Sequence, residues 1–579
     1  MFRLFRYLRN YKKESFIGPL FKLIEACFEL AVPIVMANII DIGIKNGDKA
    51  YIWKMGGIMV LLGFLGLACA LTAQYFAAKA SVGFGTALRR DLFRHINTLS
   101  YSEIDSIGSH TLVTRMTADI NTAQAGVNIL LRLLLRSPFI VLGSIIMAFT
   151  ISVKLTLIFL IIAPCLAYVI YKIMSITIPR YKVIQKTLDR TNLMTSETLT
   201  GARVIRAFSR QQDEEESFRK NTEELNRLQI NAGRINALMN PLTYVIVNLA
   251  IAAIIWFGGK TVYSGAITQG EVIALVNYMN QILLALLAMA ILVTNITKMQ
   301  ASAIRINDIF DVKTTVSEEG NTAVKSVENA PCVEFRDVDF SYNSSEENSL
   351  EGLSFAVGRG ETVGIIGGTG SGKTSVINLI PRFYDAAKGS VLVDGVDVKK
   401  YPLKQLRGKI GIVPQKAILF KGTVRDNMKW RDKTASDEEI WRALDIAQAA
   451  DFVKDKPSQL DEAIMQEGKN LSGGQRQRLT IARALVGNPE ILILDDSASA
   501  LDFATDARLR KAIAEKTQGM TVFIVSQRIS SIKNVDRIIV LDDGKIAGIG
   551  SHKELYKNCG VYKEICLSQL SEKEVQDIG

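Results

Sequence analysis

The chain has 579 residues, of which 48% are apolar, and a formal net charge of +11 at pH 7. This length predicts two or three domains instead of one. A mean hydropathy of +0.18 is higher than is usual for a soluble protein, so part of the chain is expected to lie in lipid. The six cysteines form no CxxC motif, and neither they nor the three histidines show metal-ligand spacing, which argues against a disulfide framework and a zinc site.

The first half of the chain is predicted to cross a membrane. A span needs about 20 mostly apolar residues, and six stretches qualify before residue 300, whereas none does after it. Residues 2–12 alternate basic and apolar side chains and predict an amphipathic helix on the inner membrane surface. The expected spans are 16–43, 55–84, 126–150, 155–177, 240–265 and 272–298.

The basic residues predict the orientation. They gather before the first span, between the second and third, and between the fourth and fifth, whereas the alternate loops are short and carry few of them. The positive-inside rule therefore places the N-terminus, both long loops and the C-terminal half in the cytoplasm, with the chain in the inner (cytoplasmic) membrane. This distribution accounts for the positive charge without nucleic acid as a partner. The two long loops, of about 40 and 60 residues, are expected to be helical hairpins because unstructured loops of that length are uncommon.

The second half of the chain has a different composition and residue pattern. Residues 311–330 are polar and lack apolar periodicity, which predicts a linker. After it, short β-rich runs alternate with helical stretches, a pattern typical of an α/β domain with a largely parallel sheet. The expected fold is multidomain: an all-α, six-helix transmembrane domain over 1–310 with long cytoplasmic helical loops, the linker, and an α/β nucleotide-binding domain over 331–579.

A phosphate-binding loop follows the apolar strand ETVGII and opens a helix. Its glycines let backbone N–H groups converge on phosphates, the lysine reaches the β- and γ-phosphates of ATP, and the threonine ligates Mg²⁺. The residues expected to bind the nucleotide here are Gly367, Gly368, Thr369, Gly370, Ser371, Gly372, Lys373, Thr374 and Ser375.

Two further motifs follow in the second half. Asp495 ends the apolar run ILIL, and a carboxylate there is expected to hold the Mg²⁺ shell. Ser472, Gly473, Gly474 and Gln475 precede a helical stretch, so their N–H groups and hydroxyl can bind a second phosphate at a helix N-terminus. Because the chain's own phosphate loop is already a cradle, this second anion site makes sense if it closes over a nucleotide held by another subunit.

The phosphate loop, LSGGQ and Asp495, in this order and spacing, resemble the ATP-binding-cassette (ABC) family, and the six spans ahead of them resemble its exporter branch. The resemblance implies that Tyr342 stacks on adenine and that Gln415 links Mg²⁺ to the membrane domain. It also implies that the loop from Ser499 to Asp502 contacts the opposite site. The resemblance covers the whole chain.

Two departures from the family pattern stand at one site. The family places a glutamate after the Mg²⁺ aspartate, to polarise the attacking water, whereas this chain has Asp496, which is one methylene shorter. It also places a histidine facing the γ-phosphate, where this chain has Gln527, which cannot carry charge. Asp496, Gln527 and Gln415 are therefore the expected catalytic positions of a degenerate site. The chain closely resembles the degenerate-site subunit of bacterial heterodimeric multidrug exporters.

The expected function is that of one subunit of an ATP-driven, heterodimeric translocase that moves amphipathic drugs or similar hydrophobic compounds out of the cell. Hydrolysis would occur mainly at the site that this chain's LSGGQ completes with its partner, a second half-transporter. Residues 100–110 and 200–210 are the expected coupling segments. The alternatives are a lipid or peptide exporter, a homodimeric exporter, and a non-transporting regulatory subunit.

Charged residues also occur inside the expected spans. Glu25 and Glu29 share one helix face, as do Arg132 and Arg136, and both sets lie toward the inner leaflet. Intramembrane charges are usually paired or face a cavity. A substrate-cavity lining and an ion pair between helices are both compatible with this pattern.

Overall fold

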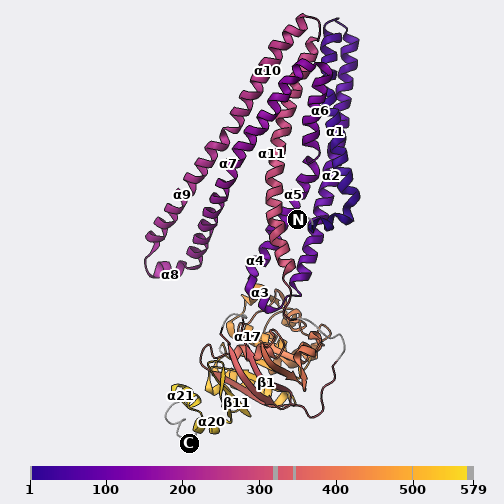
Figure 1. Ribbon diagram of the computed structural model, residues 1–579. Coiled ribbons are helices and arrows are strands. Elements are labelled where there is room, and N and C mark those ends of the chain that lie inside the picture. The colour runs from indigo at the N-terminus through magenta and orange to yellow at the C-terminus, as the bar shows by residue number, and fades with distance from the viewer. Residues whose placement is uncertain (1–2, 317–323, 343–346, 499, 570–579) are drawn as a thin grey trace. The chain divides into compact units, whose positions relative to one another are not determined.

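The computed structural model describes residues 3–316, 324–342, 347–498 and 500–569. The chain divides into two compact units, which are described separately below (Figure 1). The helical unit comprises Met1–Asn97 and His110–Asp311, and the α/β unit comprises Thr98–Ser109 and Val312–Gly579. The segment 98–109, expected within the first domain, therefore groups with the second.

Six helical segments of the described chain are long and apolar enough to cross a membrane, as the sequence predicted. Each exceeds the length of its expected span because the helices continue beyond the apolar stretch. At a rise of about 1.5 Å per residue, 40 residues reach about 60 Å, twice the hydrocarbon core. The segments are Leu4–Ile44, Lys49–Ile96, Ser109–Ile151, Val153–Thr200, Gln211–Tyr263 and Gln269–Asp311.

Within these segments the helical unit has regular helices joined by short irregular turns. The N-terminal stretch Leu4–Tyr11 is a 3₁₀ helix that leads into the first long helix and buries Leu4 and Tyr7. The sequence predicted a helix here, and its place on the membrane surface stays a prediction. The helices are α1 (Lys12–Asn38), α2 (Lys49–Ile96), α4 (Ser109–Thr114), α5 (Ile120–Leu133), α6 (Arg136–Ile151), α7 (Val153–Thr200), α8 (Ala202–Ala207), α9 (Gln211–Ala237), α10 (Met239–Tyr263) and α11 (Gln269–Asp311). A π-helical turn, Ile39–Ile44, ends the first segment, and another, Arg115–Asp119, interrupts the third.

The second long loop is the helical hairpin that its length and composition predicted. Helices α7 and α9 run side by side and α8 closes their tip (Figure 1). The contact between the two arms contains Ile184, Leu225 and Ala232, which are buried, and Asn221 donates a 2.7 Å hydrogen bond to Thr191. The tip itself has no buried residue in α8.

Two ion pairs lie among the charged residues inside the described membrane-spanning helices. Lys22 Nζ lies 2.6 Å from a carboxylate oxygen of Glu25 on the same helix, and Arg136 on α6 lies 2.7 Å from Glu29 on α1. Glu25 and Glu29 also line a cavity of about 450 Å³ between α1 and α2. Glu29 thus forms the expected ion pair between helices and lines a cavity, whereas Glu25 lines the cavity but pairs within its own helix.

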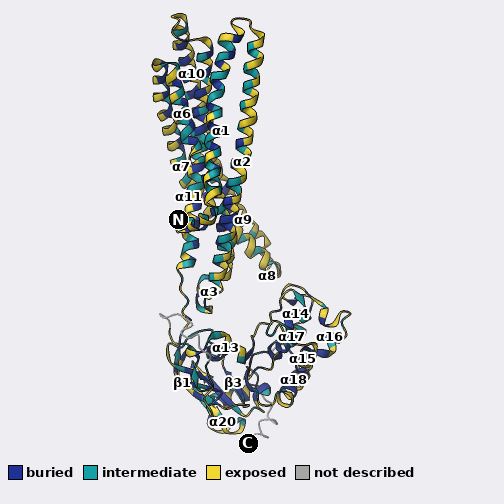
Figure 2. Cartoon of the chain, turned by 90° about the vertical axis from the view of Figure 1, so that its right-hand side faces the viewer, coloured by how far each residue is buried: buried dark blue, intermediate teal, exposed yellow. Residues whose placement is uncertain are grey.

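Two sheets form the core of the α/β unit. The larger has the order β12-β11-β3-β10-β9-β6, in which all neighbours are parallel except β11 and β12. The smaller sheet, β2-β1-β4-β5, is antiparallel. The core strands are dark blue in Figure 2, since β9 and β10 are buried at every residue. This confirms the predicted α/β domain with a largely parallel sheet.

The strands and helices of this unit have the following bounds. The strands are β1 (Val333–Phe340), β2 (Leu350–Val357), β3 (Thr362–Gly367), β4 (Lys388–Val393), β5 (Val396–Asp397), β6 (Ile410–Val413), β7 (Gly422–Thr423), β8 (Ala463–Ile464), β9 (Ile491–Asp495), β10 (Thr521–Val525), β11 (Arg537–Asp542) and β12 (Lys545–Gly550). The helices are α3 (Tyr101–Ile107), α12 (Lys373–Leu379), α13 (Leu403–Lys409), α14 (Val424–Met428), α15 (Asp437–Ile446), α16 (Ala450–Lys454), α17 (Gly473–Leu485), α18 (Phe503–Lys516), α19 (Ile529–Ile532), α20 (His552–Asn558) and α21 (Gly560–Gln569).

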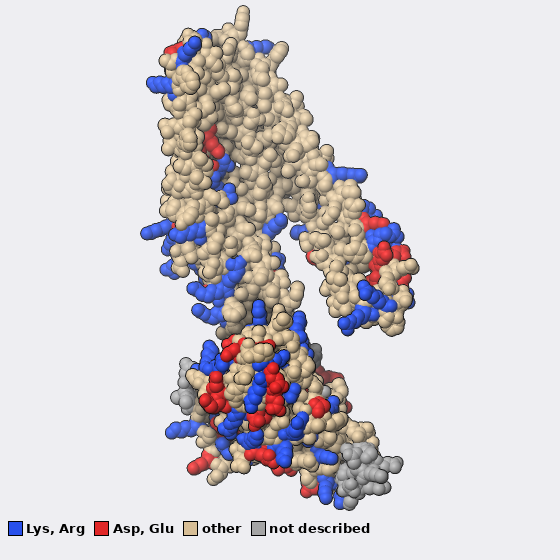
Figure 3. Space-filling view, turned by 180° about the vertical axis from the view of Figure 1, so that it is seen from behind, with Lys and Arg blue, Asp and Glu red and all other residues tan. Residues whose placement is uncertain are grey.

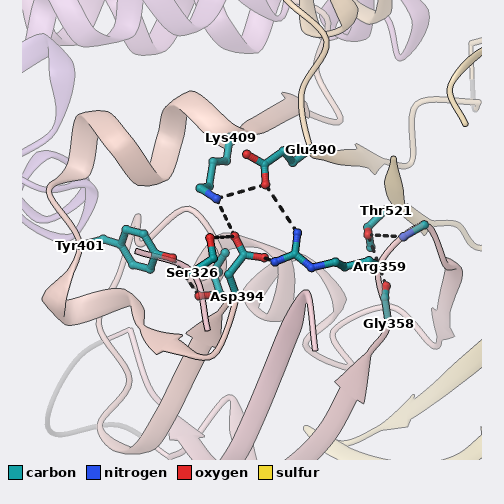
Figure 4. Close-up of polar contacts among 10 residues, drawn as sticks. Ser326, Gly358, Arg359, Asp394, Tyr401, Lys409, Glu490 and Thr521 are labelled. Carbon is teal, nitrogen blue, oxygen red and sulfur yellow. Dashed lines mark hydrogen bonds and ion pairs between the residues drawn. The ribbon is translucent and has the colours of Figure 1, made fainter. Parts of the chain in front are cut away.

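Asp394, in the turn between β4 and β5, ties the two sheets together (Figure 4). Its side chain is 1% exposed and lies 2.5 Å from Arg359 and 2.6 Å from Lys409. Lys409 also lies 3.1 Å from Glu490. Because these cations come from the segment before β3 and from the end of α13, one buried carboxylate holds the antiparallel sheet against the parallel one.

The structure describes two parts of the expected linker over 311–330, one on each side of residues 317–323. Helix α11 continues to Asp311, and residues 317–323 lie outside the described chain. Beyond them, Val324 exchanges two hydrogen bonds with the side-chain amide of Gln405, and Val327 N donates to Asp394 O. The polar composition that predicted a linker does not prevent this segment from pairing with the α/β unit.

Candidate functional site

A cavity of about 320 Å³ lies at the carboxyl ends of β3, β9 and β10. This edge of a parallel sheet is where ligands bind in open α/β folds. Fourteen residues line it: Tyr342, Ser349, Thr369, Gly370, Gly372, Lys373, Thr374, Ser375, Gln415, Asp495, Asp496, Val525, Ser526 and Gln527. Eleven of these were predicted from the sequence.

The phosphate loop forms the floor of the cavity. Gly370 and Gly372 have φ of +86° and +90°, a region that other L-residues rarely adopt. A Cβ at Gly372 would also lie 2.5 Å from Leu350 and 2.9 Å from the carbonyl oxygen of Ser349. The loop can therefore take this path only with glycine at these positions, which leaves its backbone open to a bound group.

Lys373 is held inside the curve of this loop. Its ammonium group donates to the carbonyl oxygens of Gly367 and Gly368, at 3.0 Å for Gly367, and lies 3.3 Å from Ser371 Oγ. Burial lowers the pKa of Lys373, while Asp495 and Asp496 oppose that shift. A buried cation beside a glycine-rich loop is the arrangement that receives a polyphosphate.

Thr374 and Asp495 provide oxygen atoms at the side of the loop. Thr374 Oγ1 lies 3.3 and 3.4 Å from the two carboxylate oxygens of Asp495. Burial raises the pKa of Asp495, because the neighbouring protein groups do not fully replace the water that would stabilise the charged carboxylate. A hydroxyl and a carboxylate in this position fit Mg²⁺, which is typically bound by one or two carboxylates together with substrate phosphates.

That metal would therefore be shared with the nucleotide. Within the described residues no group of three or more His, Cys, Asp or Glu side chains could hold a metal ion alone. Thr374 and Asp495 would hold the Mg²⁺, whose charge stabilises the phosphates as hydrolysis proceeds. Gln415 lines the same cavity, as expected.

Asp496 and Gln415 are in contact. Asp496 has a φ of +42°, and its backbone N–H donates to Val525 O at 2.9 Å. Burial raises the pKa of Asp496, and a side-chain hydrogen bond with Gln415 opposes that shift. The left-handed backbone turns the Asp496 side chain toward the cavity. There it is within reach of Gln415, which is predicted to link Mg²⁺ to the membrane domain.

Gln527 follows β10 on the other side of the cavity. The segment after this strand is held by Ser526, whose N–H donates to Ile365 O at 3.1 Å and whose hydroxyl accepts from Arg528 N at 3.0 Å. Gln527 itself is exposed. The cavity thus includes both residues that depart from the family pattern.

Tyr342 lines the cavity from the antiparallel sheet and is 40% exposed. Its hydroxyl shares a 2.9 Å hydrogen bond with Ser375 Oγ in the first turn of α12. This bond places an aromatic ring beside the phosphate loop, where the base of a nucleotide would lie.

The signature residues Ser472, Gly473, Gly474 and Gln475 do not line this cavity. They open α17, where Ser472 Oγ accepts from Gln475 N at 3.2 Å and Gln475 Oε1 accepts from Ser472 N at 3.0 Å. This capping box holds the turn, and Ser472 and Gly473 are exposed. Ser499 lies outside the described residues, while Asp502 accepts from Thr505 N at 3.1 Å and caps α18.

The first expected coupling segment folds as α3 and packs in the α/β unit. Asp105 accepts a 2.8 Å hydrogen bond from the hydroxyl of Tyr384, and the rings of Tyr101 and Phe383 are 4.6 Å apart. Tyr384 also meets Tyr342 edge-on at 5.2 Å. One tyrosine therefore touches both α3 and an aromatic residue of the nucleotide cavity.

Sequence reasoning did not single out Tyr384, Ser349, Val525 or Ser526. Val525 and Ser526 could have been found as the neighbours of Gln527, since they end the same strand. Tyr384 and Ser349 carry no motif, and only the fold brings them to the cavity or to α3.

The comparisons with known proteins agree with this geometry. A family model described as "ABC transporter transmembrane region" matches residues 15–286, and one described as "ABC transporter" matches residues 350–499. An uncharacterized ABC transporter ATP-binding protein of Mycobacterium tuberculosis is 35% identical over 99% of both chains. The chain belongs to the ABC transporter family.

Other relatives of this ABC transporter carry different functional descriptions. An ATP-dependent lipid A-core flippase of Desulfotalea psychrophila is 32% identical over 97% of this chain and 98% of its own. YfiB of Bacillus subtilis, an uncharacterized ABC transporter ATP-binding protein, is 34% identical over 98% of both chains. A solved bacterial Atm1-family ABC exporter with ATP bound has the same fold, with a TM-score of 0.82, 24% identity, and coverage of 97% of this chain and 100% of its own.

The chain is thus an ATP-driven exporter half-transporter, with a transmembrane domain of six helices and an ATP-binding domain that couples hydrolysis to transport. A half-transporter requires a second subunit. The arrangement of the signature at an exposed helix start, away from the chain's own cavity, fits that requirement.

Proposed function

We propose that this chain is the degenerate-site subunit of a heterodimeric exporter. The observation that carries the proposal is the pair Asp496 and Gln527, which line the same cavity where the family pattern has glutamate and histidine. Loss of one residue could be tolerated, but loss of both at an otherwise complete site favours a subunit that binds ATP and hydrolyses it slowly.

The chemistry of the two side chains supports slow hydrolysis. A general base must come within hydrogen-bond reach of the attacking water, and a carboxylate one methylene shorter retreats by about 1.5 Å. The hydrogen bond with Gln415 further holds Asp496 at the cavity wall. Gln527 can donate a hydrogen bond, but it cannot offer a positive charge.

In this proposal Lys373 and the loop amides bind the phosphates, Thr374 and Asp495 hold Mg²⁺, and Tyr342 packs on the adenine. Ser472–Gln475 completes the partner's competent site. ATP sandwiched between two subunits would draw the cassettes together and favour an outward-facing membrane domain. Segments α3 and α8, at residues 100–110 and 200–210, would transmit that closure.

The proposed cargo is an amphipathic or hydrophobic compound, exported across the cytoplasmic membrane with the N-terminus and ATP-binding domain inside. The cavity between α1 and α2, lined by Glu25, Glu29 and otherwise apolar residues, supports this class. Lipid transport is the second candidate, because relatives of this chain are named lipid A-core flippases.

The experiment is co-purification of the tagged chain from its native membrane, followed by exchange of bound radiolabelled ATP. We expect a second half-transporter with glutamate and histidine at the two deviant positions, and one slowly and one rapidly exchanging nucleotide. A homodimer that hydrolyses ATP briskly and transports would refute the asymmetric assignment. Dye and lipid efflux from vesicles containing the pair then separates the two candidate cargoes.

A further inference from the structure

The last described helix, α21, reaches back to the segment that carries Gln527. The side-chain amide of Gln569 makes two hydrogen bonds with the main chain there. Its Nε2 donates to the carbonyl oxygen of Gln527 at 2.7 Å, and its Oε1 accepts from the N–H of Ile529 at 2.9 Å. A single planar amide thus clamps the backbone on both sides of Arg528.

The position of Gln569 is set by buried residues on its own helix. Tyr562 and Cys566, about two turns and one turn earlier on the same face, are fully buried in the core of the α/β unit. The Tyr562 hydroxyl also shares a 2.7 Å hydrogen bond with His552 Nδ1. Because the helix is anchored in this way, the Gln569 amide is presented to the loop with little freedom.

The loop needs an external partner at this point. Helix α19 has only four residues, and its N-cap, Arg528, makes no side-chain capping hydrogen bond. The N–H of Ile529 is at the first position of that helix and is one of the groups that a helix leaves unpaired. Gln569 supplies the missing acceptor and at the same time fixes the carbonyl group of Gln527.

We propose that Gln569 is a positioning residue for the nucleotide site, which holds the Gln527 side chain at the cavity and so sets the preference of this site for ATP over ADP. The inference rests on the proposed role of Gln527 as the group nearest the terminal phosphate. ATP and ADP differ only in that phosphate, so a displaced Gln527 would weaken ATP binding and leave ADP binding unchanged.

The test uses the full chain with its co-purified subunit in nanodiscs. Photolabelling with radiolabelled 8-azido-ATP, followed by gel separation of the subunits, reports the nucleotide held by this chain, and competition by ATP and by ADP gives the two relative affinities. The variant Gln569→Met keeps the length of the side chain but makes neither hydrogen bond. We expect its ATP-to-ADP preference to fall about fivefold, the effect of about one net hydrogen bond.

Control variants separate this role from a structural one. Glu564→Ala changes an exposed residue of the same helix and should leave the preference unchanged. Gln527→Ala should lower the preference, and adding Gln569→Met to it should have no further effect, because the second residue acts through the first. The melting temperature of every variant is measured alongside.

Three results overturn the proposal. If Gln569→Met keeps the wild-type preference while Gln527→Ala loses it, the clamp does not position Gln527. If Gln569→Met weakens ATP and ADP equally, the residue acts only through stability. If Gln527→Ala itself leaves the preference unchanged, the proposed role of Gln527 fails, and the role of Gln569 fails with it.

Discussion

The hydroxyl of Tyr384 donates a 2.8 Å hydrogen bond to Asp105 of α3. Burial raises the pKa of Tyr384, and the hydrogen bond to Asp105 adds to the shift, so the phenol remains a donor at every physiological pH. The same ring touches Tyr342 at the nucleotide cavity. This places one side chain between a proposed coupling segment and the proposed adenine site.

Replacing Tyr384 by Phe is expected to weaken coupling. The variant keeps the ring contacts but removes the bond to Asp105, a loss of about 1 kcal/mol. We expect transport per ATP hydrolysed to fall while basal ATP hydrolysis is retained, as measured by dye efflux and phosphate release in proteoliposomes. Tyr401→Phe is the matched control, because its hydroxyl donates to Val393 O inside the α/β unit. Equal coupling in both variants would contradict the assignment.

We expect Asp495 to lower the stability of the nucleotide-free protein, although its carboxylate serves nucleotide binding. Burial raises its pKa, which means that the folded state binds a proton at this group more tightly than the unfolded state. Its contribution therefore destabilises the nucleotide-free protein above the raised pKa, and stability recovers as the pH falls through it toward the ordinary value of about 4.

Asp495→Asn removes this penalty. We expect the nucleotide-free variant to melt above wild type at pH 7, with the difference shrinking as the pH is lowered toward 4. Stabilisation by ATP with Mg²⁺ should be lost at the same time. Thermal scans with and without ATP and Mg²⁺ check both effects, and a variant that melts lower than wild type at pH 7 would contradict the sign.

Restoring the family residues at the degenerate positions should activate this chain's own site. In the double variant Asp496→Glu and Gln527→His, we expect the turnover of nucleotide held by this chain to rise about tenfold or more, in line with the usual contribution of a placed general base. The measurement is single-turnover hydrolysis in a pair whose other phosphate loop is blocked. Asp451→Glu, which lengthens an exposed carboxylate of α16, is the control and should change nothing. Unaltered turnover in the double variant would contradict the assignment of slow hydrolysis to Asp496 and Gln527.

Asp394 is expected to be essential to the stability of the α/β unit. Asp394→Ala removes the carboxylate that Lys409 and Arg359 share and leaves both cations beside Glu490, which lies 3.1 Å from Lys409 and 4.0 Å from Arg359 (Figure 4). Because Glu490 still compensates the charge of the two cations in part, we expect a loss of about 2–3 kcal/mol, the cost of a lost hydrogen bond between charged groups. Urea unfolding followed by a cassette-specific probe should show this loss. Lys388→Ala, which breaks an exposed pair with Asp337, should cost less than about 1 kcal/mol. Equal small losses would mean that the carboxylate does not join the two sheets.

The surface of the helical unit agrees with its proposed environment. In Figure 3 the middle part of this unit is mostly free of charged side chains, a few charged side chains lie at its upper end, and Lys and Arg side chains are more numerous toward its lower end. Exposed apolar residues such as Trp53, Phe64 and Ile161 are costly in water and favourable in lipid. These exposed apolar residues belong to the apolar runs of the sequence, and those runs alone predicted all six spans.

The sequence by itself determined the six spans, the α/β domain and the nucleotide motifs, because each depends on residues close together in the chain. Apolar length, strand periodicity and the glycines at 370 and 372 act within one or two turns, and their effect is the same in any fold. The ends of the elements were less predictable, because helix α11 continues through polar residues to Asp311 where packing, not composition, sustains it.

Only the tertiary structure decided which distant residues meet. Asp105 and Tyr384 are 279 positions apart, and Gln527 and Gln569 are 42 apart, and no local pattern marks either pair. Their hydrogen bonds exist because buried neighbours fix the backbones on which they stand. A sequence motif shows which side chains do the chemistry of a site. The residues that position those side chains depend on which other segments of the chain the hydrophobic core brings next to them.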